Sequence, residues 1–138
     1  MKKLLFAMLI VSLIMFSNLS YAKGKVSPTV SKINNYELIE LNLLNGLENE
    51  NTGLKSSSAF LLGEFKSEKS VIPLMRVLRN NEEPALRIMA ALALYKIGDA
   101  RGIWAVKQAS RFDDNECVRK KCNQFYTVYA IDKEKEEN

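Results

Sequence analysis

Two cysteines, Cys117 and Cys122, are the residues whose type and spacing could carry redox or nucleophilic chemistry, and the chain of 138 residues has no histidine. Without histidine the chain cannot form a His-containing catalytic triad, a His general base or a His-containing zinc site. On an ideal helix their spacing separates the two cysteines by about 140° around the axis, too far for a relaxed disulfide. Cys117 is expected in the first turn of its helix, however, where the backbone can depart from helical geometry.

Three interpretations of this pair remain open: an intramolecular disulfide, a buried Cys122 with a free Cys117, and a redox pair. The redox interpretation lacks the Cys-x-x-Cys motif and the thioredoxin-like strand and helix pattern. The sequence also lacks an EF-hand calcium loop, a phosphate-binding loop and a dinucleotide-binding fingerprint. We therefore expect no metal site and no cofactor.

The first 22 residues have the layout of a secretory signal. Residues 1–3 include two lysines, residues 4–16 are almost wholly apolar, and the small residues Ser20 and Ala22 occupy the −3 and −1 positions of a cleavage site. The sequence therefore predicts cleavage after Ala22 and an exported protein, periplasmic or extracellular. An uncleaved membrane anchor is the alternative, although the apolar stretch is shorter than the ~20 residues of a spanning helix. Export would place both cysteines in a compartment that favours oxidation.

The charge of the chain depends on this cleavage. The full sequence has 20 Lys+Arg against 16 Asp+Glu, a net charge of +4. Removal of residues 1–22, which include Lys2 and Lys3 and no acidic residue, leaves 116 residues with a net charge of +2. This balance gives no basic footprint for nucleic acid, so we expect no nucleic-acid partner. A chain of this size can bury roughly two thirds of its unfolded surface and form a core without disulfides.

The mature chain repeats itself at an offset of 32 residues. The offset pairs apolar residues with apolar residues: Leu54 with Leu86, Ala59 with Ala91, Leu62 with Leu94, Phe65 with Ile97, Val71 with Ile103, Ile72 with Trp104, and Leu74 with Val106. A further step of 32 places Leu86 on Val118 and Leu94 on Tyr126. One register that holds through three copies indicates repeated supersecondary units.

Each unit is predicted to be a pair of helices. Residues 86–97 have apolar side chains at helical spacing, and Gly98 suits the left-handed position after a helix. The second helix is predicted over 71–79 in one unit and over 103–111 in the next. Polar runs at 48–52, 80–83 and 113–116 separate the units and supply helix caps. Residues 36–47 predict a further helix that corresponds to the second helix of a unit.

The sequence therefore divides into a signal peptide over 1–22, a flexible lead over 23–35, a repeat domain over 36–130 and a charged tail over 131–138 that we expect to fray. The predicted fold class is all-α, a short α-solenoid of about three stacked helix pairs. Helix pairs of this kind bury their apolar faces against neighbouring pairs.

Residues 86–99, Leu-Arg-Ile-Met-Ala-Ala-Leu-Ala-Leu-Tyr-Lys-Ile-Gly-Asp, resemble a HEAT repeat of the short, phycocyanobilin-lyase-like kind. The family's unit has a hydrophobic residue followed by Arg, an Ala-Ala step, a Leu and then Ile-Gly-Asp before its second helix. The first copy keeps Ala59, Leu62 and Gly63, whereas the last copy has Asn123 in place of an alanine, which is typical of a terminal, capping unit. The resemblance covers residues 36–130. It implies a fold but no particular chemistry, because such repeats serve many functions.

The resemblance also implies that the second helices line the concave side of the stack. Arg79 and Arg111 occupy equivalent positions there, with Arg76 and Lys107 one turn earlier. We expect these cations to form a basic ridge that binds carboxylates or phosphates of a partner. The alternative is a solvated helix face whose terminal cations complement the helix dipole.

Three further residues could bind a partner or stabilise the stack: Trp104, Arg87 and Arg119. Trp104 flanks the apolar stripe of its helix and is either an interface anchor or a residue packed between two repeats. The resemblance implies that Arg87 and Arg119 form bonds between units.

The sequence predicts an exported HEAT-repeat module that binds or scaffolds another protein with an acidic surface and is not an enzyme. A membrane would be a partner only if the signal is uncleaved. The alternative is a thiol/disulfide accessory or redox protein that uses Cys117 and Cys122. A bilin-lyase-type enzyme is a third interpretation, which predicted export makes less suitable.

Overall fold

The computed structural model describes the backbone of residues 35–137, so the predicted signal and nearly all of the lead lie outside the described residues. The described part is helical and contains no strand. Its elements are α2 (Asn35–Leu47), α3 (Thr52–Glu64), the 3-10 helix η2 (Glu68–Ser70), α4 (Val71–Asn80), α5 (Pro84–Ile97), α6 (Ala100–Phe112) and α7 (Glu116–Glu137). Within this part, no helix combines the length and the hydropathy that crossing a bilayer requires.

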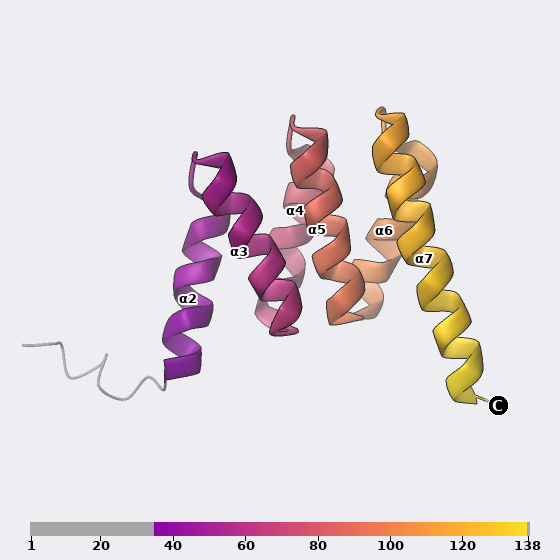
Figure 1. Cartoon of the computed structure of the whole chain (residues 1–138), viewed down its shortest axis with the longest axis horizontal. Coiled ribbons are helices and arrows are strands. Elements are labelled where there is room, and N and C mark those ends of the chain that lie inside the picture. Colours follow the sequence, from indigo (N-terminus) through magenta and orange to yellow (C-terminus); the bar gives the residue numbers. More distant parts are fainter. Residues whose placement is uncertain (1–34, 138) are drawn as a thin grey trace, which may run out of the picture. The chain divides into compact units, whose positions relative to one another are not determined.

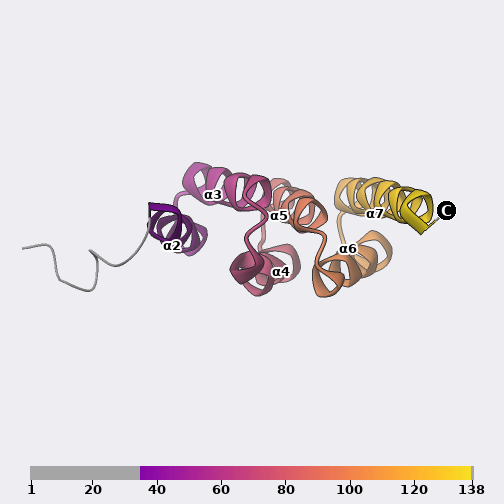
Figure 2. The ribbon, with the colours of Figure 1, turned by 90° about the horizontal axis from the view of Figure 1, so that it is seen from below.

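The helices are arranged in two layers (Figures 1 and 2). In the first layer α3 packs on α5 and α5 packs on α7, and in the second layer α4 packs on α6. α4 also packs on α5, as α6 packs on α7 and α2 packs on α3. The described residues therefore contain two complete pairs, α3–α4 and α5–α6, with a second helix before them and a first helix after them. This arrangement confirms the predicted all-α solenoid.

Fully buried core positions also repeat at the 32-residue offset. Ala59 and Ala91 are fully buried on the first helices of the two pairs, and so are Leu62 and Leu94. The second helices repeat this at a pair of positions 32 apart that are likewise fully buried, Leu74 and Val106. The core is thus a continuous strip along the stack, to which each unit contributes the same positions.

The turns before α3, α5 and α7 repeat one hydrogen bond. Asn49, Asn81 and Asp113 each accept a hydrogen bond from the backbone N–H two residues further on, at 2.8, 3.0 and 2.9 Å. A side-chain oxygen that bonds in this way stabilises a tight turn without a regular backbone pattern. Because the three positions are 32 residues apart, the polar runs form the same turn in each unit.

Arg87 joins two successive turns. Its guanidinium donates to the carbonyl of Asn81 at 2.9 Å and, through Nε and Nη2, to both carboxylate oxygens of Asp113 at 3.0 and 2.8 Å. Nη2 also donates to the carboxylate of Asp114 at 2.6 Å. The Arg87 and Asp113 side chains are both buried. Arg87 therefore bonds the turn before α5 to the turn before α7, as the family resemblance implied.

The ionisation of Asp113 is set by this contact. Burial alone raises the pKa of Asp113, but the hydrogen bonds from Arg87 and from the backbone of Asn115 outweigh burial and hold the pKa below its usual value. Arg119 repeats part of the pattern, because it donates to the carbonyls of Asp113 and Asp114 at 2.6 and 3.1 Å. Arg119 thus supports the turn that precedes its own helix.

A second buried carboxylate connects α2 to the start of the next unit. Glu40 on α2 is buried and accepts hydrogen bonds from the Ser67 hydroxyl at 2.6 Å and from the Lys69 ammonium at 2.9 Å. These two hydrogen bonds lower the pKa of Glu40. The contact fixes α2 against the segment between α3 and α4.

Small residues allow the first helices to approach closely. A Cβ atom added at Gly63 would lie 2.7 Å from the Cα of Ala93, so α3 and α5 could not keep their separation with a larger residue there. Gly98 ends α5 with a φ of 76°, the left-handed conformation predicted for it.

The C-terminal helix is longer than the sequence suggested. α7 continues to Glu137, so residues 131–137 of the expected charged tail are helical. The segment contains neither glycine nor proline, and Lys133 pairs with Glu136 one turn further along at 2.9 Å. Charge alone therefore did not end the helix, because pairs of opposite charge at this spacing stabilise it.

We expect acid to destabilise this fold. The pKa values of Glu40 and Asp113 are lowered, and the hydrogen bond from Arg101 lowers that of Asp99 to about 2. A carboxylate with a depressed folded pKa adds stability above its unfolded pKa and loses it as the pH falls through the folded pKa. The free energy of unfolding should therefore fall from about pH 5 toward about pH 2, as urea titrations followed by circular dichroism would measure.

The variant Asp113→Asn tests the source of this dependence. It should lose about 2 kcal/mol at neutral pH, since Arg87 would keep a weaker partner, and it should flatten the acid slope. Glu82→Gln, a substitution at an exposed carboxylate, is the matched control and should change neither quantity. A wild-type slope in Asp113→Asn would contradict the assignment.

Candidate functional site

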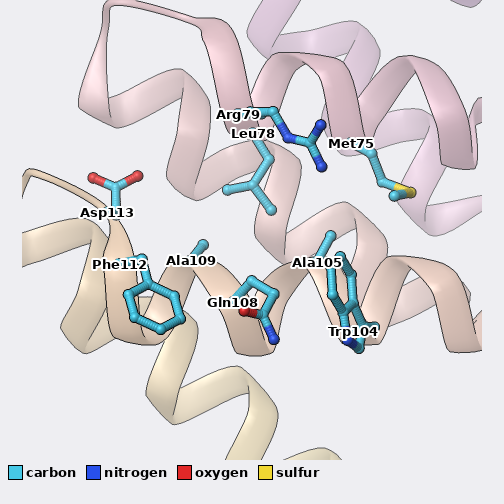
Figure 3. Close-up of a pocket in the computed structure, with 9 residues that line it drawn as sticks. All are labelled: Met75, Leu78, Arg79, Trp104, Ala105, Gln108, Ala109, Phe112 and Asp113. Carbon is cyan, nitrogen blue, oxygen red and sulfur yellow. The ribbon is translucent and has the colours of Figure 1, made fainter.

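A groove of about 310 Å³ lies between the second helices of the two complete pairs (Figure 3). Side chains of α4 and of α6 line it from opposite sides. Its lining consists of Met75, Leu78 and Arg79 from α4, Trp104, Ala105, Gln108, Ala109 and Phe112 from α6, and Asp113 just after α6.

Two large aromatic side chains of this groove are exposed. Trp104 follows the buried Ile103 on α6 but is itself 55% exposed, and Phe112 at the end of α6 is 76% exposed. Trp104 is therefore not packed between two repeats. Exposed tryptophan beside apolar side chains is typical of surfaces that become buried in a complex.

The expected basic ridge is only partly present. Arg79 lies in the groove with Trp104, and Arg111 is exposed on α6 outside the groove lining. Arg76, by contrast, pairs with Glu48 at 3.2 Å, and the Lys107 ammonium lies 5.0 Å from the centre of the Tyr126 ring. The four cations therefore do not form one continuous ridge.

Arg79 and Met75 also belong to neighbouring hollows. One, of about 300 Å³, is lined by Ile72, Met75, Arg76, Arg79 and Asn80. Another, of about 470 Å³, is lined by Met75, Ala100, Arg101 and Trp104. Because the hollows share residues, the outer surface of α4 and α6 is one uneven apolar surface with cations along it.

The sequence interpretation missed Met75 and Phe112. The register aligns Met75 with Lys107 and Phe112 with Asn80, so neither residue repeats and neither was assigned to a shared face. The available signal was amphipathicity: both residues are large and apolar on short helices whose buried stripe is made by other positions.

The two cysteines lie in different environments. Both are free thiols, with Cys117 exposed and Cys122 buried, which corresponds to the second of the three interpretations. Burial, with a smaller contribution from the Asp113 charge, raises the pKa of Cys122 to about 12. Since the thiolate is the nucleophile, Cys122 is unreactive in the folded protein at neutral pH.

Among the described residues, His, Cys, Asp and Glu side chains form no group of three or more that could hold a metal ion.

The two thiols should differ in reactivity. In the folded protein kept reduced, a maleimide should modify Cys117 rapidly and Cys122 only after denaturation, because Cys122 is buried and protonated. Mass spectrometry of the labelled chain counts the modified thiols. Cys117→Ser should abolish the rapid modification, and two rapidly labelled thiols in the wild type would contradict the assignment.

Comparison with known proteins agrees with the geometry. A family model described as HEAT repeats matches residues 40–124, from within α2 to the first half of α7. A comparison with curated proteins gave no match. HEAT repeats commonly serve as scaffolds for protein interaction. The match extends over more than half of the chain and coincides with the stacked helix pairs, and it shows that this chain belongs to the HEAT-repeat family.

Proposed function

We propose that this protein is an exported, non-catalytic module that binds another protein through the groove between α4 and α6. The observation that supports the proposal is the combination of exposed Trp104 and Phe112 with Arg79 in one groove. Aromatic residues and arginine are the side chains that contribute most to binding energy in protein interfaces. The family's general role in protein interaction agrees with this assignment.

The partner surface that fits this groove is acidic and apolar together. Arg79 in the groove and Arg111, outside its lining but next to Phe112 in the sequence, are both exposed, and neither forms an ion pair in the described part of the chain. Arginine can bind a carboxylate through two parallel hydrogen bonds. Asp113, at the end of the groove, is already bonded to Arg87, so its charge is offset within the protein. A partner carboxylate beside an apolar side chain would match Arg79 and the apolar wall at Met75.

The composition of the groove supports binding rather than catalysis. The chain has no histidine, and the side chains that line the groove include no pair of nucleophile and general base. Cys122, whose pKa is raised to about 12, lies in the core instead.

Affinity purification of the tagged chain from its native host tests the groove. The double variant Arg79→Glu/Arg111→Glu should lose the partner, and Trp104→Ala should weaken the binding roughly tenfold or more in a titration with that partner. The charge-matched control is Lys121→Glu/Lys135→Glu, which changes exposed cations on α7 and should keep the partner. Equal retention by both double variants would refute the groove as the binding surface.

Export has its own test. The N-terminal peptide of the protein isolated from its native host should begin at Lys23, since Ser20 and Ala22 form the predicted cleavage site. Mass spectrometry of the intact chain would identify its N-terminal residue, and cell fractionation would identify its compartment. An intact N-terminus on a membrane-bound chain would contradict cleavage after Ala22. It would indicate that residues 4–16 anchor the protein in the membrane.

A further inference from the structure

The N-terminal end of the stack presents an apolar face formed by α2 and α3. Most of the exposed large apolar side chains in the described residues belong to these two helices or to the residue that follows α3. They include Leu38, Ile39 and Leu41 on α2, Leu54 and Leu61 on α3, and Phe65 just after it. A terminal unit of a solenoid normally presents a polar outer face, so residues 35–137 supply no cap at this end.

The repeat register shows what is missing at this end. Leu54 on α3 is 47% exposed, whereas its equivalents, Leu86 on α5 and Val118 on α7, are 3% and 0% exposed. Leu61 is 38% exposed, whereas its equivalent Ala93 is 1% exposed. The position of Leu54 is therefore buried in both α5 and α7, and that of Leu61 is buried in α5, whereas both are exposed in α3.

The equivalents of Leu61, which are Ala93 on α5 and Phe125 on α7, contact the preceding first helix. Gly63 of α3 packs against Ala93 of α5, and the Tyr95 ring of α5 stacks on the Phe125 ring of α7 at 5.8 Å between centroids. In the described part of the chain, α3 is the first member of its layer and has no such helix before it (Figure 2). The exposed face is thus the surface on which one further first helix would pack.

α2 does not cover this surface, because it occupies the position of a second helix. It packs on α3 as α4 packs on α5. A Cβ atom added at Gly46 of α2 would lie 2.1 Å from the Ser58 hydroxyl of α3. The equivalents of these two residues are Leu78 of α4 and Ala90 of α5, both buried where α4 packs on α5. Among the helices that the structure describes, none therefore covers the face beside Leu54 and Leu61.

The chain's own sequence does not supply the missing helix in register. The offset of 32 assigns residues 20–32 to this place, and they contain Gly24, Pro28 and three lysines without a leucine stripe. Glycine and proline are the residues least compatible with the interior of a helix. Removal of the predicted signal would also cut this segment at Ala22.

A second copy does not continue the stack either. The outer face of α7 would have to seat on α3 of the next copy. At the positions where α3 has Ala59 and Gly63, α7 has Asn123 and Thr127, and both are exposed and polar. Within the described helices, these polar positions cap the C-terminal end, whereas the N-terminal face of α2 and α3 is uncovered.

We propose that an amphipathic helix of a partner protein docks on the α2–α3 face and completes the first repeat. The register also specifies its chemistry. The stripe that seats α3 on α5 contains Ala59, Leu62 and Gly63, and the equivalent residues of α5 are Ala91, Leu94 and Tyr95. The docking helix should therefore carry a small residue followed by Leu three positions later on one face, with polar residues opposite.

A peptide of the protein's own α5 is a suitable probe, because α5 carries this stripe. The full sequence 84–97, capped at both ends and labelled with a fluorophore, is titrated with the exported chain and followed by anisotropy. We expect saturable binding together with slower hydrogen exchange in α3. Leu94→Asp in the peptide should weaken binding roughly tenfold or more, because it places a charge in an apolar contact.

Variants of the protein locate the peptide. Leu61→Asp on α3 and Ile39→Asp on α2 should each weaken binding roughly tenfold or more, and Val128→Asp, at a similarly exposed apolar residue of α7, should not. Thermal unfolding of each variant checks that the fold is kept. Binding that survives both Leu61→Asp and Ile39→Asp in folded protein would overturn the proposal.

The other possible occupants give different results. A concentration-dependent dimer that Leu61→Asp abolishes would assign the face to a second copy. Exclusion of the peptide by a chain that retains residues 1–22 would assign it to the chain's own N-terminus. Absence of peptide binding to the exported chain would also overturn the proposal. The variant Arg79→Glu/Arg111→Glu should bind the peptide normally, so this face and the α4–α6 groove can fail separately.

Discussion

The buried pair of Arg87 and Asp113 is the contact on which the geometry of the stack depends. A solenoid has no interactions between distant repeats, so its curvature and spacing are set by contacts between neighbours. Arg87 bonds the turn before its own helix and the turn before the next first helix, and therefore fixes one unit relative to the other. Because breaking a buried ion pair leaves an uncompensated charge, this contact resists displacement more than an equivalent area of surface contacts.

The same pair connects the fold to the candidate binding surface. Asp113 ends the groove between α4 and α6, and its carboxylate is held inward by Arg87. The position of α6, and with it Trp104, thus follows from the turn that Asp113 stabilises. Arg79 on α4 forms no ion pair within the described residues and is exposed. The structure combines a rigid frame with a few unsatisfied side chains on its surface, which is the arrangement that favours binding with little loss of conformational entropy.

The sequence predicted the features that repeat and missed those that do not. The offset of 32 indicated the helix pairs and the buried strip at Leu62 and Leu94, because identical packing demands similar residues. The pairing of Arg76 with Glu48 depends on how α2 lies beside α4, which no local pattern encodes. The groove at Met75 depends likewise on the space between helices of two units. Export and cleavage stay predictions, since those residues lie outside the described part of the chain.

The polar outer face of α7 has a consequence for assembly. A stack with apolar surfaces at both ends would add copies head to tail and grow into an open filament, since nothing in a translational repeat closes the chain of contacts. Asn123 and Thr127 end the series at one terminus. Head-to-tail growth of copies is therefore blocked, and a helix bound at the other terminus would complete a finite particle.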